Sequence, residues 1–195
     1  MPRTATIHRT TRETDIRLTL DLDGSGKAEI ATGIGFFDHM LDLFARHGLF
    51  DLIVAARGDL HVDQHHTVED VGICLGQALR EALGDRSGIV RYGHALAPMD
   101  EALLLAAIDV SGRPYFAGDL DVHGRTIGGF DAELAPEFFR ALATNGLITL
   151  HLRQIAGENA HHIVEGAFKA VARALAAATR RDERVEGVPS TKGVL

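Results

Sequence analysis

Cysteine is almost missing from this sequence, and so are the features that mark secreted and membrane proteins. The chain of 195 residues contains one cysteine, Cys74, so no disulfide can form within it. A reducing compartment, the cytoplasm, is therefore the expected location. The N-terminal stretch lacks the apolar core of a signal peptide. No apolar run reaches the roughly 18 residues of a membrane span, so no membrane partner is expected.

Positive charge is also scarce. The 20 Lys and Arg residues against 27 Asp and Glu residues give a formal net charge of -7, and no block of like charges stands out. Because nucleic-acid backbones need a basic surface, a nucleic-acid-binding module is disfavoured. Histidine is unusually frequent, with 11 residues, and this frequency points to metal or proton chemistry.

The chain contains an internal repeat. The stretch HHTVEDVGICLGQALREAL, which begins at His65, matches HHIVEGAFKAVARALAAAT, which begins at His161. Upstream of these stretches, Gly48 falls on Gly146. Fixed-period similarity of this kind indicates a duplicated structural unit.

We therefore predict one compact domain over residues 1–195, made of two repeats, about 5–92 and 93–180, and a C-terminal tail, 181–195. Apolar positions after each HHxVE motif follow the 3–4 spacing of a helix with one buried face. The expected fold class is α+β, with a duplicated ββαββα-type unit. Its four helices pack between two four-stranded mixed sheets.

The two HHxVE motifs lie at the predicted starts of helices. Neighbouring residues on a helix point about 100° apart, so adjacent histidines are poorly placed to bind one ion together. Each can bind a separate ion with help from elsewhere, and imidazole with carboxylate suits Mn, Fe, Co, Ni or Zn. A solvated helix end is the alternative for one copy, but two matched copies favour metal ligands. The candidates are His65, His66, Glu69, His161, His162 and Glu165.

Other residues are candidates for completing these sites. His39 opens a predicted helix and is matched in the repeat by Glu137, and both residue types ligate metals. Capping or surface roles are the alternative for this pair. Glu13, whose repeat counterpart is Glu101, is a candidate acid or base. Isolated basic and hydroxyl residues suit a phosphate, with a surface role as the alternative for each: Arg91, Arg113, Lys169, Ser190, Thr191 and Lys192.

As a set, the motifs resemble the imidazoleglycerol-phosphate dehydratases of histidine biosynthesis. The resemblance runs from about residue 5 to 195 through GIGFFDHMLDLFARHGLFDL, DQHHTVEDVGICLGQAL, DVSGRPY, GENAHHIVEGAFKAVARAL and PSTKGVL. It implies a ribosomal protein S5 domain 2-like fold, in the single-function form not fused to a phosphatase. It also implies removal of water from D-erythro-imidazole-glycerol phosphate to give imidazole-acetol phosphate. The implied cofactor is Mn²⁺, two ions per subunit, bound at subunit contacts in a homo-oligomer of 24 subunits.

The resemblance also implies roles for single residues. The implied metal ligands are His39, His65, His66, Glu69, His161, His162 and Glu165. The implied catalytic residues are Glu13, as acid or base, with His65, Glu69, His161 and Glu165. The implied substrate-binding residues are Glu13, His39, His47, Arg91, Arg113, Lys169, Ser190 and Lys192.

Glu137 remains open between two interpretations. Some relatives have His at this position, so Glu137 either ligates the metal in place of an imidazole or is a helix-start carboxylate, with water filling the coordination position. A non-catalytic metal-binding shell protein is the main rival to the enzyme. Such a protein would need neither Glu13 nor Arg91 nor the PSTK tail.

Overall fold

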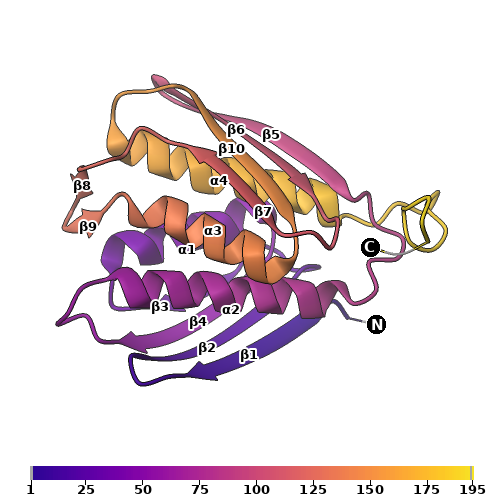
Figure 1. Cartoon of the computed structure of the whole chain (residues 1–195), viewed down its shortest axis with the longest axis horizontal. Helices are drawn as coiled ribbons and strands as arrows, with labels where there is room; N and C mark the ends of the chain where they lie inside the picture. The colour runs from indigo at the N-terminus through magenta and orange to yellow at the C-terminus, as the bar shows by residue number, and fades with distance from the viewer. Residues whose placement is uncertain (1, 194) are drawn as a thin grey trace.

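Two four-stranded sheets enclose a layer of four helices in the computed structural model, which describes residues 2–193 and 195 (Figure 1). The first half of the chain contributes, in order, β1 (Thr4–Thr10), β2 (Thr14–Asp21), β3 (Ala28–Ala31), α1 (Gly35–Gly48), β4 (Asp51–Gly58) and α2 (His65–Leu83). The second half contributes β5 (Tyr92–Met99), β6 (Ala102–Asp109), β7 (Tyr115–Asp119), β8 (Thr126–Ile127), β9 (Phe130–Asp131), α3 (Leu134–Gly146), β10 (Thr149–Ala156) and α4 (Ala160–Thr179).

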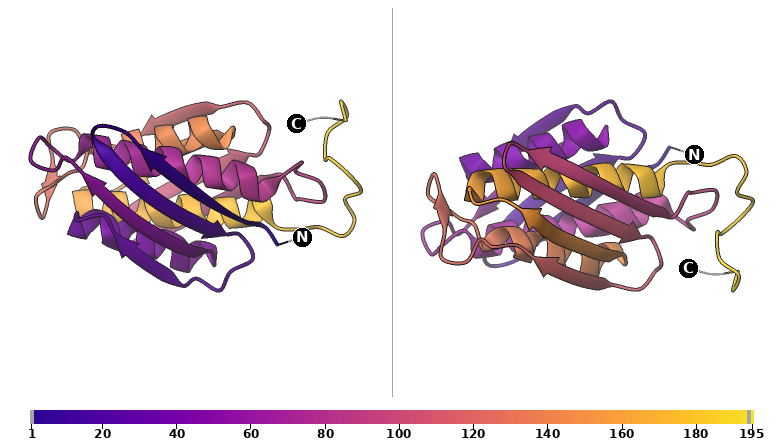
Figure 2. Two further views of the ribbon diagram at one scale, coloured as in Figure 1. Left: turned by 90° about the horizontal axis from the view of Figure 1, so that it is seen from below. Right: turned by 90° about the horizontal axis from the view of Figure 1, so that it is seen from above.

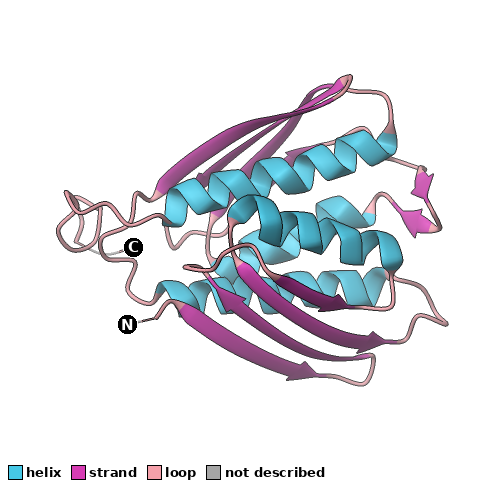
Figure 3. Ribbon diagram, turned by 180° about the vertical axis from the view of Figure 1, so that it is seen from behind, coloured by secondary structure: helices cyan, strands magenta, loops and turns pink. Residues whose placement is uncertain are grey.

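The two large sheets have the same topology. Their strand orders are β1-β2-β4-β3 and β5-β6-β10-β7. In each sheet the last strand pairs in parallel with its neighbour, and the other pairs are antiparallel. Each sheet covers its own side of the helix layer, as Figure 2 shows from the two outer faces and Figure 3 from behind. The predicted α+β class, with four helices between two mixed sheets, is confirmed.

The order of elements within each half differs from the predicted ββαββα unit. Three strands precede the first helix, so each half runs βββαβα, and the second half adds the small hairpin β8–β9. The unexpected strand β3 is a four-residue edge strand, in which half-buried and exposed positions alternate without any fully buried one. Pairing with its neighbour β4 stabilises β3 more than its own apolar residues do. The periodicity of the sequence therefore does not reveal this strand.

Phenylalanines join the two halves in the middle of the helix layer. Phe138 of α3 meets Phe37 of α1 edge-on, with ring centroids 5.4 Å apart, and stacks on Phe168 of α4 at 5.1 Å. All three rings are fully buried, and burial of each stabilises the fold by about 2–3 kcal/mol. Because these helices come from both halves, the halves share one core.

The lone thiol lies in the same layer. Cys74 of α2 is fully buried, and burial raises its pKa to about 11.

The described helices are all too short or too polar to span a membrane.

Helices α2 and α3 approach each other closely because glycines lie at their contact. A Cβ atom added at Gly72 would lie 2.8 Å from the carbonyl oxygen of Phe138. One added at Gly76 would lie 2.7 Å from both the amide nitrogen of Gly146 and the carbonyl oxygen of Leu142. Since these are backbone atoms, a side chain at either position would force the helices apart.

We expect Gly76→Ala to lower the free energy of unfolding by about 1–3 kcal/mol, because the backbone of α3 would have to shift. Gly35→Ala is the matched control. A Cβ atom at Gly35, the first residue of α1, meets nothing within 4 Å, and alanine has the higher helix propensity. Denaturant unfolding measures both variants, and an unchanged stability of Gly76→Ala would contradict the tight contact.

Candidate metal and substrate site

Both His-His pairs lie in the first turn of a helix, as predicted. His65 is the first residue of α2, and His161 is the second residue of α4. A side chain two residues upstream fixes each start. Asp63 Oδ1 accepts the backbone N–H of His65 at 2.8 Å, and Asn159 Oδ1 accepts that of His161 at 2.9 Å. These bonds satisfy amides that have no partner within the helix and so hold the pairs in place.

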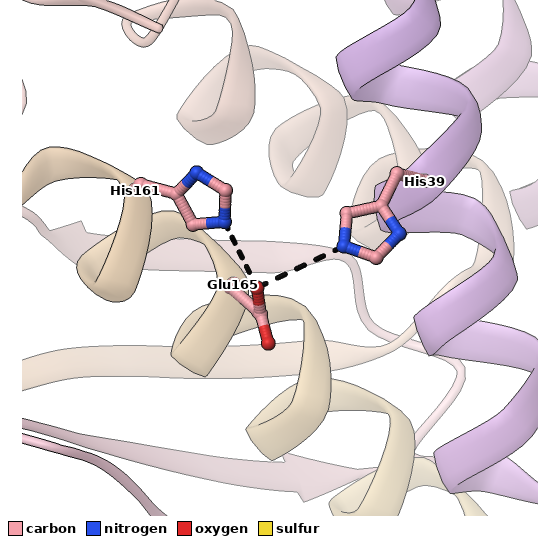
Figure 4. Close-up of side chains that lie close together, drawn as sticks. All are labelled: His39, His161 and Glu165. Carbon is pink, nitrogen blue, oxygen red and sulfur yellow. Dashed lines mark hydrogen bonds and ion pairs between the residues drawn. The ribbon is translucent and has the colours of Figure 1, made fainter.

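His39, His161 and Glu165 converge from α1 and α4 (Figure 4). Oε2 of Glu165 lies 3.0 Å from Nε2 of His161 and 3.9 Å from Nε2 of His39. In the part of the chain that the structure describes, this is the only group of three His, Cys, Asp or Glu side chains with ligand atoms within 4.8 Å of one another. Two imidazoles and a carboxylate suit a borderline divalent metal ion.

Lys169 contacts the same carboxylate from one helical turn further on. Its Nζ donates to Oε1 of Glu165 at 2.5 Å, and the Glu165 side chain is only 9% exposed. Burial pushes the pKa of Glu165 upwards, but the hydrogen bonds and charges of Lys169 and His161 outweigh it, so the pKa is lowered overall. The lowered pKa favours the ionised form of Glu165, the form in which a carboxylate binds a metal. Two effects lower the pKa of His47 of α1: burial is the larger, and the positive charge of Lys169 comes next.

The second histidine of each pair binds a different carboxylate. Nδ1 of His66 lies 3.0 Å from Asp59 Oδ2, and Nδ1 of His162 lies 2.7 Å from Glu101 Oε2. These hydrogen bonds raise the pKa of each histidine, and the bond from His162 contributes most to lowering the pKa of Glu101 to about 2.

The free nitrogens of these two rings face further carboxylates. Nε2 of His66 lies 3.9 Å from Oε1 of Glu13, the predicted acid or base. Nε2 of His162 lies 3.7 Å from Oδ2 of Asp100. Sequence reasoning missed Asp59 and the role of Glu101. The one signal for Glu101 was its repeat match to Glu13, and Asp59 reaches His66 only because β4 ends beside the start of α2.

The remaining predicted ligands are not gathered within one chain. His65 and Glu69 lie 3.9 Å apart, and both side chains are nearly half exposed. Glu137, the repeat counterpart of His39, pairs with Arg140 at 3.3 Å on the surface of α3. Among the described residues, no third metal-binding side chain comes within the same reach of the His65–Glu69 pair.

The predicted phosphate residues form a separate pocket of about 720 Å³. Its walls are Arg91, Tyr92, Arg113, Pro189, Ser190, Thr191 and Lys192. Arg91 donates to Asp109 at 2.8 Å and to the carbonyl oxygen of Pro189 at 2.8 Å, so it fastens the tail to the start of β5. Arg113 reaches the same Asp109 at 3.5 Å. Of the predicted phosphate-type residues only Lys169 lies elsewhere, on Glu165.

The chain is similar in sequence and fold to proteins of one family. A profile of the family described as imidazoleglycerol-phosphate dehydratase matches residues 32–175. The imidazoleglycerol-phosphate dehydratase of Gluconacetobacter diazotrophicus is 62% identical over 194 residues, which cover 99% of this chain and 98% of the relative. That of Desulforamulus reducens is 60% identical over 193 residues, with the same coverage.

Two solved structures agree with this. The structure of the enzyme from Pyrococcus furiosus matches with a TM-score of 0.84 at 44% identity, over 97% of this chain and 100% of that one. The structure of the Staphylococcus aureus enzyme matches with a TM-score of 0.83 at 39% identity, over 92% of this chain and 99% of that one.

We expect Glu137→Ala to weaken the binding of one metal ion, because Glu137 occupies the repeat position of His39 and a carboxylate suits a hard ion such as Mn²⁺. Glu137→His should keep that ion and shift the preference towards Zn²⁺ or Co²⁺. Elemental analysis of purified variants measures both. If Glu137→Ala holds as much metal as the parent protein, Glu137 is only the partner of Arg140.

Proposed function

Because the chain belongs to the imidazoleglycerol-phosphate dehydratase family, and is thus a hydro-lyase of histidine biosynthesis, we propose that it removes water from D-erythro-imidazole-glycerol phosphate to give imidazole-acetol phosphate. The observation that best supports this reaction is the convergence of His39, His161 and Glu165. A buried, ionised carboxylate is costly unless a positive charge compensates it. Together with two imidazoles, it offers suitable ligand atoms for a metal cation.

The proposal includes two Mn²⁺ ions per subunit. His39, His161 and Glu165 form one candidate ligand set, and their donor atoms fit such an ion. The other candidate ligands are His65, His66, Glu69, Glu137 and His162. A bound Mn²⁺ supplies a Lewis acid that stabilises negative charge on the imidazole ring of the substrate.

Glu13 is the residue that we assign to proton transfer. The C–H bond that breaks has no neighbouring carbonyl group and is hardly acidic, so its proton needs a well-placed base. Among the described residues, the Glu13 carboxylate accepts no hydrogen bond, and its one ion pair is with His66 at 3.9 Å. Its oxygens are therefore free to take the proton from carbon. The electron pair of that C–H bond forms a C=C bond as the C–O bond on the neighbouring carbon breaks, and the hydroxide takes up a proton and leaves as water. The resulting enol then tautomerises to the ketone of imidazole-acetol phosphate.

Arg91, Arg113, Ser190 and Lys192 are assigned to the substrate phosphate. Guanidinium forks and hydroxyl groups suit phosphate oxygens, and these four side chains line one pocket. Asp109 holds both arginines in place. Binding the phosphate there would convert binding energy into orientation of the imidazole end of the substrate.

The separation of this pocket from the metal ligands supports an oligomer. The backbone N–H of Arg91 donates to the carbonyl oxygen of Ala178 in the last turn of α4, whereas His161 lies in the first turn of that helix. At 1.5 Å per residue these two turns are roughly 25 Å apart, too far for one small substrate to reach both.

We therefore propose that the phosphate pocket of one subunit completes the metal site of another. The assembly is a homo-oligomer of the 24 subunits that the family resemblance implies. His65 and Glu69 are nearly half exposed and have no third donor among the described residues of their own chain, which fits sites at subunit contacts. A cytoplasmic location completes the proposal, because the lone thiol of Cys74 needs no oxidising compartment.

Removal of metal tests the reaction itself. We expect chelator-treated protein to lose turnover of imidazole-glycerol phosphate and added Mn²⁺ to restore it, because the ligand sets have no other evident purpose. Product formation is the measurement. Full activity of metal-free protein would overturn the metal-dependent mechanism, and metal binding without turnover would indicate a metal-binding shell protein instead.

Glu13→Gln removes the proposed base and keeps the shape of the side chain. We expect kcat to fall by about 10²–10⁴-fold, with metal content unchanged, because glutamine cannot take up the proton. Steady-state kinetics at saturating Mn²⁺ measure the effect. A change confined to KM would instead make Glu13 a substrate-binding residue.

A further inference from the structure

In each half of the chain a carboxylate bonds Nδ1 of the second histidine of the His-His pair, but the two carboxylates do not come from matching positions of the repeat. In the second half, Glu101 accepts the Nδ1–H of His162 at 2.7 Å and the backbone N–H groups of Asn159 at 2.9 Å and Glu158 at 3.3 Å. Glu101 is the repeat counterpart of Glu13. Yet Glu13 leaves the Nδ1 atom of His66 to another residue.

Asp59 takes the place that the repeat would give to Glu13. Its carboxylate lies 3.0 and 3.2 Å from Nδ1 of His66, and its side chain is 17% exposed, against 53% for Glu13. The backbone N–H of Asp59 donates to the carbonyl oxygen of Glu13 at 3.1 Å, so the two residues are held side by side. The position matching Asp59 in the second half is Gly157, which has no side chain to offer.

The direction of these hydrogen bonds decides which ring nitrogen is available. An ionised carboxylate can only accept a hydrogen bond, so Nδ1 of His66 and of His162 must carry the proton. The lone pair of each neutral ring is then on Nε2. A carboxylate behind a ligating histidine fixes both its tautomer and the orientation of its ring.

We propose that Asp59 and Glu101 are positioning residues, which present Nε2 of His66 and His162 to the metal ions, and that Asp59 thereby leaves the Glu13 carboxylate free for proton transfer. This assignment rests on the proposed function for the metal ions and for the role of Glu13. The positioning of the two histidines can be tested without any substrate.

The first test is the Mn²⁺ affinity of metal-free protein, measured by competition with a chelator. Asp59→Asn should weaken the binding of one Mn²⁺ ion by about 10–100-fold. Glu101→Gln should weaken the binding of the other by a similar factor. Thermal unfolding of the metal-free variants shows whether each is folded. Asp59→Asn is the cleaner variant, because Glu101 also holds backbone amides before α4.

Asp63→Asn is the matched control. It removes the same unit of charge from the same loop, but Asp63 bonds a backbone amide and not an imidazole ring. Asparagine also caps helices well, and Asn159 serves at the matching place in the second half. The Mn²⁺ affinity of the Asp63→Asn variant should equal that of the parent protein. An equal loss in Asp63→Asn and Asp59→Asn, or no loss in either, overturns the positioning role.

The second test asks whether Asp59 acts through Glu13. At saturating Mn²⁺ and substrate, Asp59→Asn should lower kcat much more in the parent protein than in the Glu13→Gln variant, because the residue that it frees is already gone. Equal fold-losses in the two backgrounds overturn this part. If no variant or parent protein turns over the substrate, the proposed function fails, while the affinity measurements still decide the positioning role.

Discussion

The contact between α2 and α3 is the constraint on which the rest of the molecule depends. Gly72 and Gly76 of α2 have no side chain to hold the two helices apart, so their backbones approach closely. Phe37, Phe138 and Phe168 then fill the middle of the layer. Because a sheet covers each side, the helices cannot slide or rotate without opening the core. The functional side chains in their first turns are thus positioned by packing and not by flexible loops.

Sequence reasoning reached the parts of this molecule that depend on local spacing. The duplicated HHxVE motif predicted two helix starts, and the i+4 spacing placed Lys169 on the face of Glu165. The strand β3 was missed because a short edge strand draws its stability from a neighbour. Asp59 was missed for a similar reason, since its contact with His66 exists only after β4 and α2 have folded together.

The periodicity of the sequence could not predict that the phosphate-type residues lie together in one pocket. Arg91, Arg113 and Lys192 are spread over a long stretch of sequence, and only the family resemblance grouped them before the pocket was seen. The assignment of metal ligands is limited in a different way. His65, Glu69 and Glu137 do not assemble within one chain, and the spacing of residues in one chain carries no information on the approach of a second.

The duplicated halves are also less alike than their motifs. Glu165 is buried against Lys169, whereas the matching Glu69 is nearly half exposed and the residue matching Lys169 is Ile73. The two proposed ions would therefore feel different charges, although their first ligands are of the same types. The repeat provides two similar candidate ligand sets, and the differences at Asp59, Lys169 and Glu137 make them unequal.

The burial of Cys74 has a practical consequence for testing the proposed assembly. A thiol with a pKa of about 11 forms almost no thiolate at neutral pH, and the thiolate is the form that attacks alkylating reagents. A cysteine introduced on the surface would thus be the one reactive thiol among the described residues. Probes attached at the start or at the end of α4 could report whether these two ends meet between subunits, as proposed, with the native cysteine left in place.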